Sequence, residues 1–149
     1  MAQDISGANT VVNIVASVTF PTGLPITQFA DDADPLDMAS IKIADTAMGL
    51  NGDLLVWGKA AKLPAVLNVI PGGPDDINLQ ILADQNRVAQ GKTSAGDVIT
   101  MTIIYPDGSL VTLINGRMTD AMFGKSIASG SFRLKTKSYA FEFQDKVGV

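Results

Sequence analysis

The stretch DVITMTIIYPDGSLVTLINGRMT (residues 97–119) decides the fold class of this chain. It places two segments rich in β-branched residues on either side of Pro106-Asp107-Gly108, which are residue types of tight turns. The pattern therefore predicts a β-hairpin.

The first strand of this hairpin carries large apolar side chains on both of its alternating faces. Val98 and Ile104 lie on one face, and Ile99, Met101, Ile103 and Tyr105 lie on the other. A strand with one face in water should alternate cleanly between apolar and polar residues. Since one helix cannot cover a whole sheet, we expect a neighbouring subunit to supply the second cover.

The rest of the chain predicts more strands. Residues 10–20 and 65–70 are rich in β-branched and apolar residues, which favour strands. Residues 40–60 predict two strands joined at Asn51-Gly52, a dipeptide typical of hairpin turns. In the last predicted strand, residues 131–144, the apolar positions change phase after Leu134, which predicts a bulge or a strand covered on both faces.

One helix is predicted after the sequence PGGP. Asp75 or Asp76 can cap its N-terminus, and Gly91 is placed to end it. One apolar face, expected to lie flat on a sheet, is formed by Ile77, Ile81, Leu82 and Val88. The chain is thus mainly β with one helix, and no linker or repeat divides residues 1–149 into more than a single domain.

Composition excludes several function classes. The chain has no cysteine and no histidine, which excludes disulfides, thiolate metal sites, Ser–His and Cys–His pairs and nearly every zinc site. The N-terminal segment lacks the pattern of an export signal, and no apolar run has the length of a membrane span. Charged residues make up 17% of the chain, against about 25% in ordinary soluble domains, which indicates that other copies cover part of the surface.

The net charge of −4 argues against wrapping nucleic acid, because phosphate binding needs a basic surface. Charge is also unevenly distributed. Residues 1–75 hold eight acids and three lysines, and residues 76–149 hold seven acids and eight bases. This asymmetry is expected either from complementary surfaces between subunits or from scatter in a small count.

An acidic stretch, FADDADPLDM (residues 29–38), raises the question of a metal or acid–base site. Its carboxylates are Asp31, Asp32, Asp34 and Asp37. An EF-hand loop starting at Asp32 fails, because Leu36 and Ile43 stand at ligand positions. An irregular calcium or magnesium site and a paired-carboxylate glycosidase site are alternatives to an exposed, solvated acidic loop, which we favour.

Other motifs support no chemistry either. NRVAQGKT (86–93) and TDAMFGKS (119–126) both lack the first glycine of a Walker A loop, and the first of them ends a helix instead of opening one. Trp57, the only tryptophan, is interpreted as a core or subunit-contact residue. An alternating basic set, interpreted as solvated or paired with acids, consists of Arg133, Lys135 and Lys137. We therefore predict that the protein is not an enzyme and holds no cofactor or metal.

Three stretches resemble the small tube proteins of contractile-tailed bacteriophages, a family related to the tubes of phage-like bacteriocins and type VI secretion systems. They are VTFPTGLPITQFADDADPLDM (18–38), LPAVLNVIPGGPDDINLQILADQNRV (63–88) and FRLKTKSYAFEFQD (132–145). The order of a leading strand, an extended hairpin, a lone helix and a closing hairpin is also similar.

The resemblance implies a small antiparallel β-barrel or sandwich flanked by one helix. It implies hexameric rings that stack into a hollow tube and conduct DNA, with no active site. The implied partners are other copies, the tail sheath, baseplate and tape-measure proteins, and the DNA in transit, but not a membrane. The implied location is the virion tail, after assembly in the host cytoplasm. Another phage structural part (a tail terminator, baseplate hub piece or decoration protein) and a small ligand-binding β-barrel are the alternatives.

Two segments are candidates for subunit contacts under this resemblance. The acidic stretch could line the bore, or it could meet Lys42, Lys59 or Lys62 of an adjoining subunit. We favour the contact, since the prolines and glycine that precede this stretch suit a reaching connection. The hairpin of residues 40–60 is the other candidate, and its Leu50 and Trp57 are expected to be partly exposed in one subunit and buried on assembly.

Overall fold

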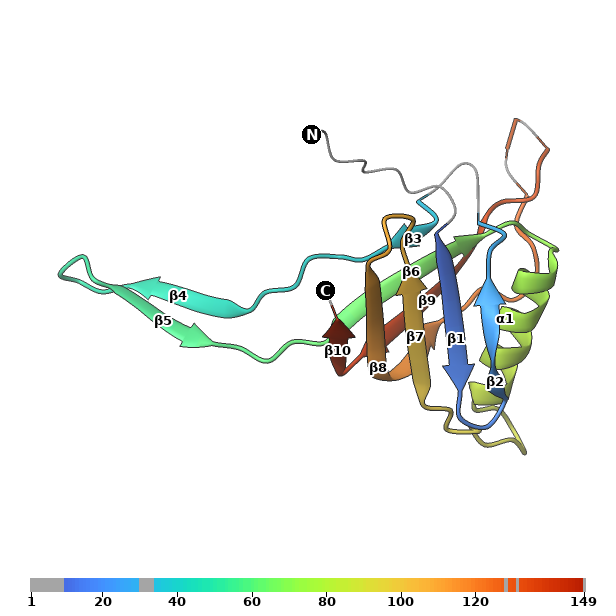
Figure 1. The fold of residues 1–149 in the computed structure, drawn as a ribbon, viewed down its shortest axis with the longest axis horizontal. Helices are drawn as coiled ribbons and strands as arrows, with labels where there is room; N and C mark the ends of the chain where they lie inside the picture. The colour runs from blue at the N-terminus through green and yellow to red at the C-terminus, as the bar shows by residue number, and fades with distance from the viewer. Residues whose placement is uncertain (1–9, 30–33, 128, 131, 149) are drawn as a thin grey trace.

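The computed structural model describes residues 10–29, 34–127, 129–130 and 132–148. The described chain is mainly β, with a single helix at one end of the body and one hairpin that projects from the other (Figure 1). The elements, in chain order, are β1 (Val11–Ala16), β2 (Phe20–Ile26), β3 (Leu36–Asp37), β4 (Ala44–Met48), β5 (Leu54–Gly58), β6 (Leu63–Val69), α1 (Pro74–Asn86), β7 (Ile99–Ile104), β8 (Leu110–Asp120), β9 (Lys137–Phe143) and β10 (Asp145–Gly148). The predicted class, mainly β with one helix, is confirmed.

The body is an antiparallel sheet that folds over on itself through its long strand β8. The strand order is β2-β1-β7-β8-β9-β6-β3, and β10 also pairs with β8. The first half of β8 pairs with β7 and β10, and its second half pairs with β9. Asn115, between the halves, has a φ of 54°, a left-handed conformation that asparagine tolerates better than most residues. The result is a sandwich whose order ends at β2 and β3, not a closed barrel.

The core lies between the two halves of the folded sheet. On β7, Ile99, Met101 and Ile103 are fully buried, whereas the threonines between them are partly exposed. The expectation of two large apolar faces on this strand was therefore wrong for its centre. Val98 precedes the strand and Ile104 ends it, so both of these side chains lie at the margin of the sheet.

The predicted change of phase in the last strand is also corrected. β9 begins at Lys137, and its Tyr139, Phe141 and Phe143 alternate regularly into the core. Phe132 is 88% exposed and belongs to the segment that precedes the strand. The two sets of apolar residues thus lie in different elements, and the register irregularity lies on β8 instead.

The predicted apolar face of α1 is mostly wrong. Leu82 is buried, but the other three members of the predicted set are 45% to 72% exposed. The side that faces the body carries Asp75, Asp76, Leu79, Leu82 and Ala83. The rotation of the helix is set by its two aspartates, which bind groups in the body, and not by the widest apolar stripe.

The helix ends also differ from the prediction. Gly73 is the N-cap residue without a side-chain hydrogen bond, and Pro74 follows it at a position where its missing N–H costs nothing. The helix stops at Asn86, before Gly91, which instead adopts a φ of 72° in a tight turn. Helix propensity alone does not locate this end, because the side chain of Asn86 binds a group outside the helix.

Both first-turn aspartates are anchors between elements. One oxygen of Asp75 accepts hydrogen bonds from the backbone N–H groups of Thr27 and Gln28, at 2.9 and 2.8 Å, after β2. Asp76 accepts a 2.6 Å hydrogen bond from the hydroxyl of Tyr139 on β9. Burial, and then this contact with Asp76, raises the pKa of Tyr139 well above its ordinary value. These bonds fasten α1 to both halves of the sandwich.

The buried carboxylate of Asp97 binds groups at the C-terminal end of α1. It accepts hydrogen bonds from the backbone N–H groups of Val18 and Thr19, at 2.7 and 2.9 Å, from the Thr19 hydroxyl, and from the side-chain amide of Asn86 at 2.8 Å. Burial raises the pKa of Asp97, but the hydrogen bonds from Thr19, Asn86 and Val18 outweigh it. The pKa therefore lies below its ordinary value.

We expect Asp97→Asn to destabilise the fold by about 2–3 kcal/mol at pH 7, because hydrogen bonds to a charged acceptor are lost and an amide N–H₂ meets donors. Since the pKa of Asp97 is lower in the folded state, its contribution is present above the unfolded pKa and is lost as pH falls through the folded value. The deficit should shrink at pH 3 in urea unfolding. The exposed Asp107→Asn is the control, and an equal deficit there would contradict this account.

Gly116, beside the bend of β8, marks a close approach. A Cβ placed there would lie 2.2 Å from Cδ1 of the buried Phe143 ring. We expect Gly116→Ala to cost about 1–3 kcal/mol, because the ring is packed and cannot move away freely. Gly58→Ala is the matched control, since a Cβ on Gly58 meets nothing within 4 Å. Equal stability of both variants in thermal unfolding would refute the contact.

Candidate assembly surface

A two-stranded arm, residues 43–59, projects from the body (Figure 1). Strands β4 and β5 form a sheet of their own, with Ala44 opposite Gly58 and Met48 opposite Leu54. At the tip, the Gly49 N–H donates to the Asp53 carbonyl at 2.8 Å, and Gly52 has a φ of 85°. The predicted turn at Asn51-Gly52 is confirmed, and its geometry needs the glycine.

The arm exposes apolar side chains on both of its faces. Consecutive residues of a strand point to opposite faces, and all four from Leu54 to Trp57 are at least 51% exposed. Met48 is 67% exposed, and Leu50 at the tip is fully exposed. The expected exposure of Leu50 and Trp57 in one subunit is confirmed. An isolated two-stranded hairpin is at best marginally stable in water.

Three lysines in or beside the arm pair within their own chain. Lys42 and Lys59 both contact Asp45 at the base of the arm, the latter at 3.3 Å, and Lys62 lies 3.0 Å from Glu142. All three lysine side chains are at least half exposed, so each pair contributes at most about 1 kcal/mol. The predicted contact of these lysines with the acidic stretch of another copy stays a prediction.

Only part of the acidic stretch is described. Asp31 and Asp32 lie outside the described residues. Asp37 lies on the short strand β3 opposite Val66, and the carbonyl of Asp34 accepts a hydrogen bond from the side chain of Asn68. Both aspartates are exposed. Within the described ranges, no three carboxylates gather as a metal site would require.

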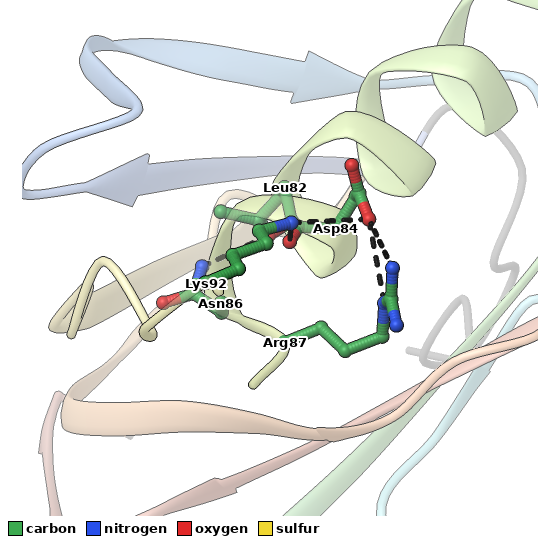
Figure 2. Close-up of polar contacts among 5 residues, drawn as sticks. All are labelled: Leu82, Asp84, Asn86, Arg87 and Lys92. Atoms are coloured by element: carbon green, nitrogen blue, oxygen red, sulfur yellow. Dashed lines mark hydrogen bonds and ion pairs between the residues drawn. The ribbon is translucent and has the colours of Figure 1, made fainter. Parts of the chain in front are cut away.

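A second feature lies at the C-terminal end of α1, on the far side of the body from the arm. Figure 2 shows Asp84 between Arg87 and Lys92, whose nitrogens lie 3.1 and 3.2 Å from its carboxylate. Hydrogen bonds from Lys92 and Arg87 hold the pKa of Asp84 below its ordinary value. Lys92 is thus bound at the end of a helix, and the sequence around it is not a phosphate loop.

Beside this ion cluster lies a hollow of about 160 Å³ between α1, the end of β8 and the residues that follow β8. The Arg87 guanidinium lies over the Phe123 ring, 5.5 Å from its centre. The hollow is lined by Ala83, Asn86, Arg87, Met118, Thr119, Asp120, Ala121 and Phe123. Its lining combines apolar side chains with the charged groups of Arg87 and Asp120.

Sequence reasoning missed two features. Phe123 is 52% exposed and Phe132 is 88% exposed, although neither was singled out as a contact residue. Lys137 was assigned to a basic strand face with Arg133 and Lys135, but it is fully buried, with Nζ 3.8 Å from Asp76 and 2.6 Å from the Gly124 carbonyl. Its alternation with the core residues of β9 was an available signal, because it shares their face.

The whole chain is similar to one family and to several solved structures. The model of a family described as tail fiber protein gp32 matches residues 3–147. A chain from the baseplate of the anti-feeding prophage aligns over 100% of this chain and 97% of its own, with 13% identity and a TM-score of 0.62. No curated protein sequence matches the chain. Among the described helices, none has the length and apolarity to cross a membrane.

Two further cryo-EM structures have the same fold. Both are from an extracellular contractile injection system called PVC. A chain of its sheath–tube complex aligns over 100% of this chain and 93% of its own, with 11% identity and a TM-score of 0.59. A chain of its sheath/tube terminator aligns over 100% and 99%, with 11% identity and a TM-score of 0.56. At these identities the likeness establishes the fold and nothing finer.

Proposed function

Because the chain belongs to the tail fiber protein gp32 family, we propose that it is a structural subunit of a phage-like tail, and specifically of the tail tube. Copies would form hexameric rings that stack into a hollow tube, with sheath, baseplate and tape-measure proteins as neighbours and DNA passing through. Its location is then the virion tail. No catalytic step is part of this function.

The observation that carries the proposal is the arm. A monomeric binding barrel has no use for a hairpin that exposes Leu54, Val56 and Trp57 to water. A subunit that buries the hairpin against another copy gains the hydrophobic free energy of those side chains, about 1.5–3 kcal/mol for each one fully buried. Other copies of the chain are the simplest source of such a surface.

Sheet edges provide additional support. Among the described strands, the order ends at β2 and β3, and β10 lies beside β8 as a further edge. β2 contains Pro21 and Pro25, which cannot donate to a ladder and are tolerated at an edge. Edges of this kind are protected in an assembly by the next subunit.

The proposal is tested by negative-stain electron microscopy of the purified full chain, with light scattering over a wide concentration range. Rings or hollow tubes are the expected result. A protein that stays monomeric, alone and with its purified baseplate as an initiator, would contradict it.

Trp57 reports on assembly by itself, because it is the only tryptophan. It is 51% exposed in the single chain, so we expect its fluorescence to shift to shorter wavelength as the arm becomes buried. The measurement is an emission spectrum across a concentration series, with an assembly-deficient variant as the control. Tubes that form with no blue shift would exclude Trp57 from the contact.

A tube terminator is the second candidate function. The fold likeness to a sheath/tube terminator covers as much of this chain as the likeness to a sheath–tube complex. The same electron micrographs separate the two, since a terminator forms single rings that do not grow, whereas a tube subunit forms stacks of variable length.

A further inference from the structure

We propose that Asn51, at the tip of the arm, is a site of spontaneous deamidation, and that this reaction limits how long a free subunit keeps its ability to assemble. The reaction uses only the chain and water. Its effect on assembly, but not the reaction itself, rests on the proposed tube function.

The chain contains two Asn-Gly dipeptides, Asn51-Gly52 and Asn115-Gly116. Asparagine is one of the thermolabile residues of proteins. Its deamidation is fastest before glycine, because glycine has no Cβ to keep its backbone nitrogen away from the preceding side chain and adopts a wide range of backbone angles. The two dipeptides are equal in sequence, so the folded structure decides which of them reacts.

The reaction joins neighbouring groups of the chain. A base in the solvent removes the proton from the Gly52 backbone nitrogen, and this nitrogen bonds to the side-chain amide carbon of Asn51. The bond from that carbon to the amide nitrogen breaks, and the nitrogen takes a proton from water and leaves as ammonia. Water then opens the resulting succinimide ring at either carbonyl, which gives an aspartate or an isoaspartate at position 51. In total, one water molecule is consumed and one ammonia is released.

The arm tip leaves Asn51 and Gly52 open to this chemistry. Both residues are exposed, and a Cβ placed on Gly52 would meet nothing within 4 Å. The Gly52 N–H donates a 2.9 Å hydrogen bond to the Gly49 carbonyl, which closes the turn. Because the tip belongs to a separate two-stranded hairpin, which is marginally stable in water, this bond opens at little cost. The backbone nitrogen is then free to reach the Asn51 side chain.

The second dipeptide is held inside the body. Gly116 is buried and lies opposite Ile99 in the pairing of β7 and β8. The ring of Phe143 occupies the space where a Cβ of Gly116 would lie. Ring closure at Asn115 would turn the Gly116 peptide out of the sheet, and opening a core strand costs nearly as much free energy as global unfolding. Asn115 is therefore protected where Asn51 is not.

Deamidation changes the arm tip in two ways. It adds a carboxylate near Asp53, which is already exposed at the tip, and next to the fully exposed Leu50. In the isoaspartate product, the main chain also gains one carbon atom inside the turn, which changes the geometry of the hairpin. A tip that is buried on assembly would then bury an unpaired charge, which is unfavourable. Deamidated subunits should therefore assemble poorly.

Peptide mapping by mass spectrometry tests the site, since each deamidation adds one dalton. The full chain is incubated at mildly alkaline pH, below the concentration at which it assembles, and in parallel in urea, where both dipeptides are unfolded and should react equally. In the folded chain, the rate at position 51 should stay within about tenfold of the urea rate, because one hydrogen bond must open. The rate at position 115 should fall by on the order of a hundredfold or more. Equal rates at both positions of the folded chain, or an intact Asn51, would overturn the proposal.

Two variants test the effect on assembly. Asn51→Asp carries one reaction product from the start, and we expect it to need about tenfold more protein to assemble. Asn51→Gln, whose longer side chain closes a ring much more slowly, should assemble after incubation as it does when fresh, whereas the incubated parent loses assembly. If position 51 deamidates but the incubated parent and Asn51→Asp assemble like the fresh parent, the effect on assembly is refuted and the tube function stands. If the fresh parent forms no rings or tubes, the tube function is overturned, and the mass spectra still decide the modification site.

Discussion

A variant in which a short Gly-Ser linker replaces residues 41–60 is expected to remain monomeric at concentrations where the full chain assembles. The deletion removes every large apolar side chain of the arm. The body should fold without the arm, because β3 and β6 pair antiparallel at Asp37 and Val66, and a short loop can join them. Light scattering and electron microscopy measure the assembly, and thermal unfolding measures the body.

Point variants test whether assembly depends on burial of the arm's side chains and not only on the presence of the arm. Trp57→Ser and Leu50→Ser should weaken assembly, whereas Trp57→Phe, which keeps an aromatic side chain, should weaken it much less. The melting temperatures of all three should match that of the parent, since both side chains are exposed in the single chain. Assembly of the arm-less protein at the parental concentration would show that the sheet edges alone hold the subunits together.

Lys137→Met is expected to produce the largest loss of stability, about 3–5 kcal/mol, because it leaves the buried carboxylate of Asp76 without its cation. Lys137 is fully buried and also donates a 2.6 Å hydrogen bond to the Gly124 carbonyl, so the substitution frees the segment before β9 as well. For a chain of this length the melting temperature should fall by roughly 10 °C. Calorimetry or urea unfolding measures the change.

The matched control is Lys62→Met, which breaks a lysine–carboxylate pair at the surface. Lys62 lies 3.0 Å from Glu142 with its side chain 69% exposed, so its loss should cost at most about 1 kcal/mol. The double variant Lys137→Met/Asp76→Asn should recover part of the loss, because no unpaired charge then stays buried. Equal effects of the two single lysine variants would mean that the buried pair contributes no more than a surface pair.

Local patterns identified most elements of this fold but not their orientation. The turns at Asn51-Gly52 and Pro106-Asp107-Gly108 depend on short-range sterics, and their hairpins lie where they were predicted. The strand expected over residues 10–20 ends earlier, at Ala16, and the proline-containing stretch after it, expected to be a connection, forms β2. The face of α1 did not follow from spacing, because Asp75 and Asp76 bind groups far away in the chain. For a helix that buries two aspartates, the periodicity of apolar residues predicts the wrong face as the buried one.

The candidate assembly surface, too, was predicted only in part from the sequence. Sequence alone determined that the chain is mainly β, that residues 40–60 form a tight hairpin, and that thiol and imidazole chemistry is absent. These features depend on composition and on neighbours along the chain. Only the tertiary structure decided which apolar residues stay in water. Leu50 and Trp57 are exposed because their hairpin leaves the body, and Phe123 borders a hollow because α1 ends beside β8. Exposure depends on contacts between distant segments, and a linear sequence does not contain them explicitly.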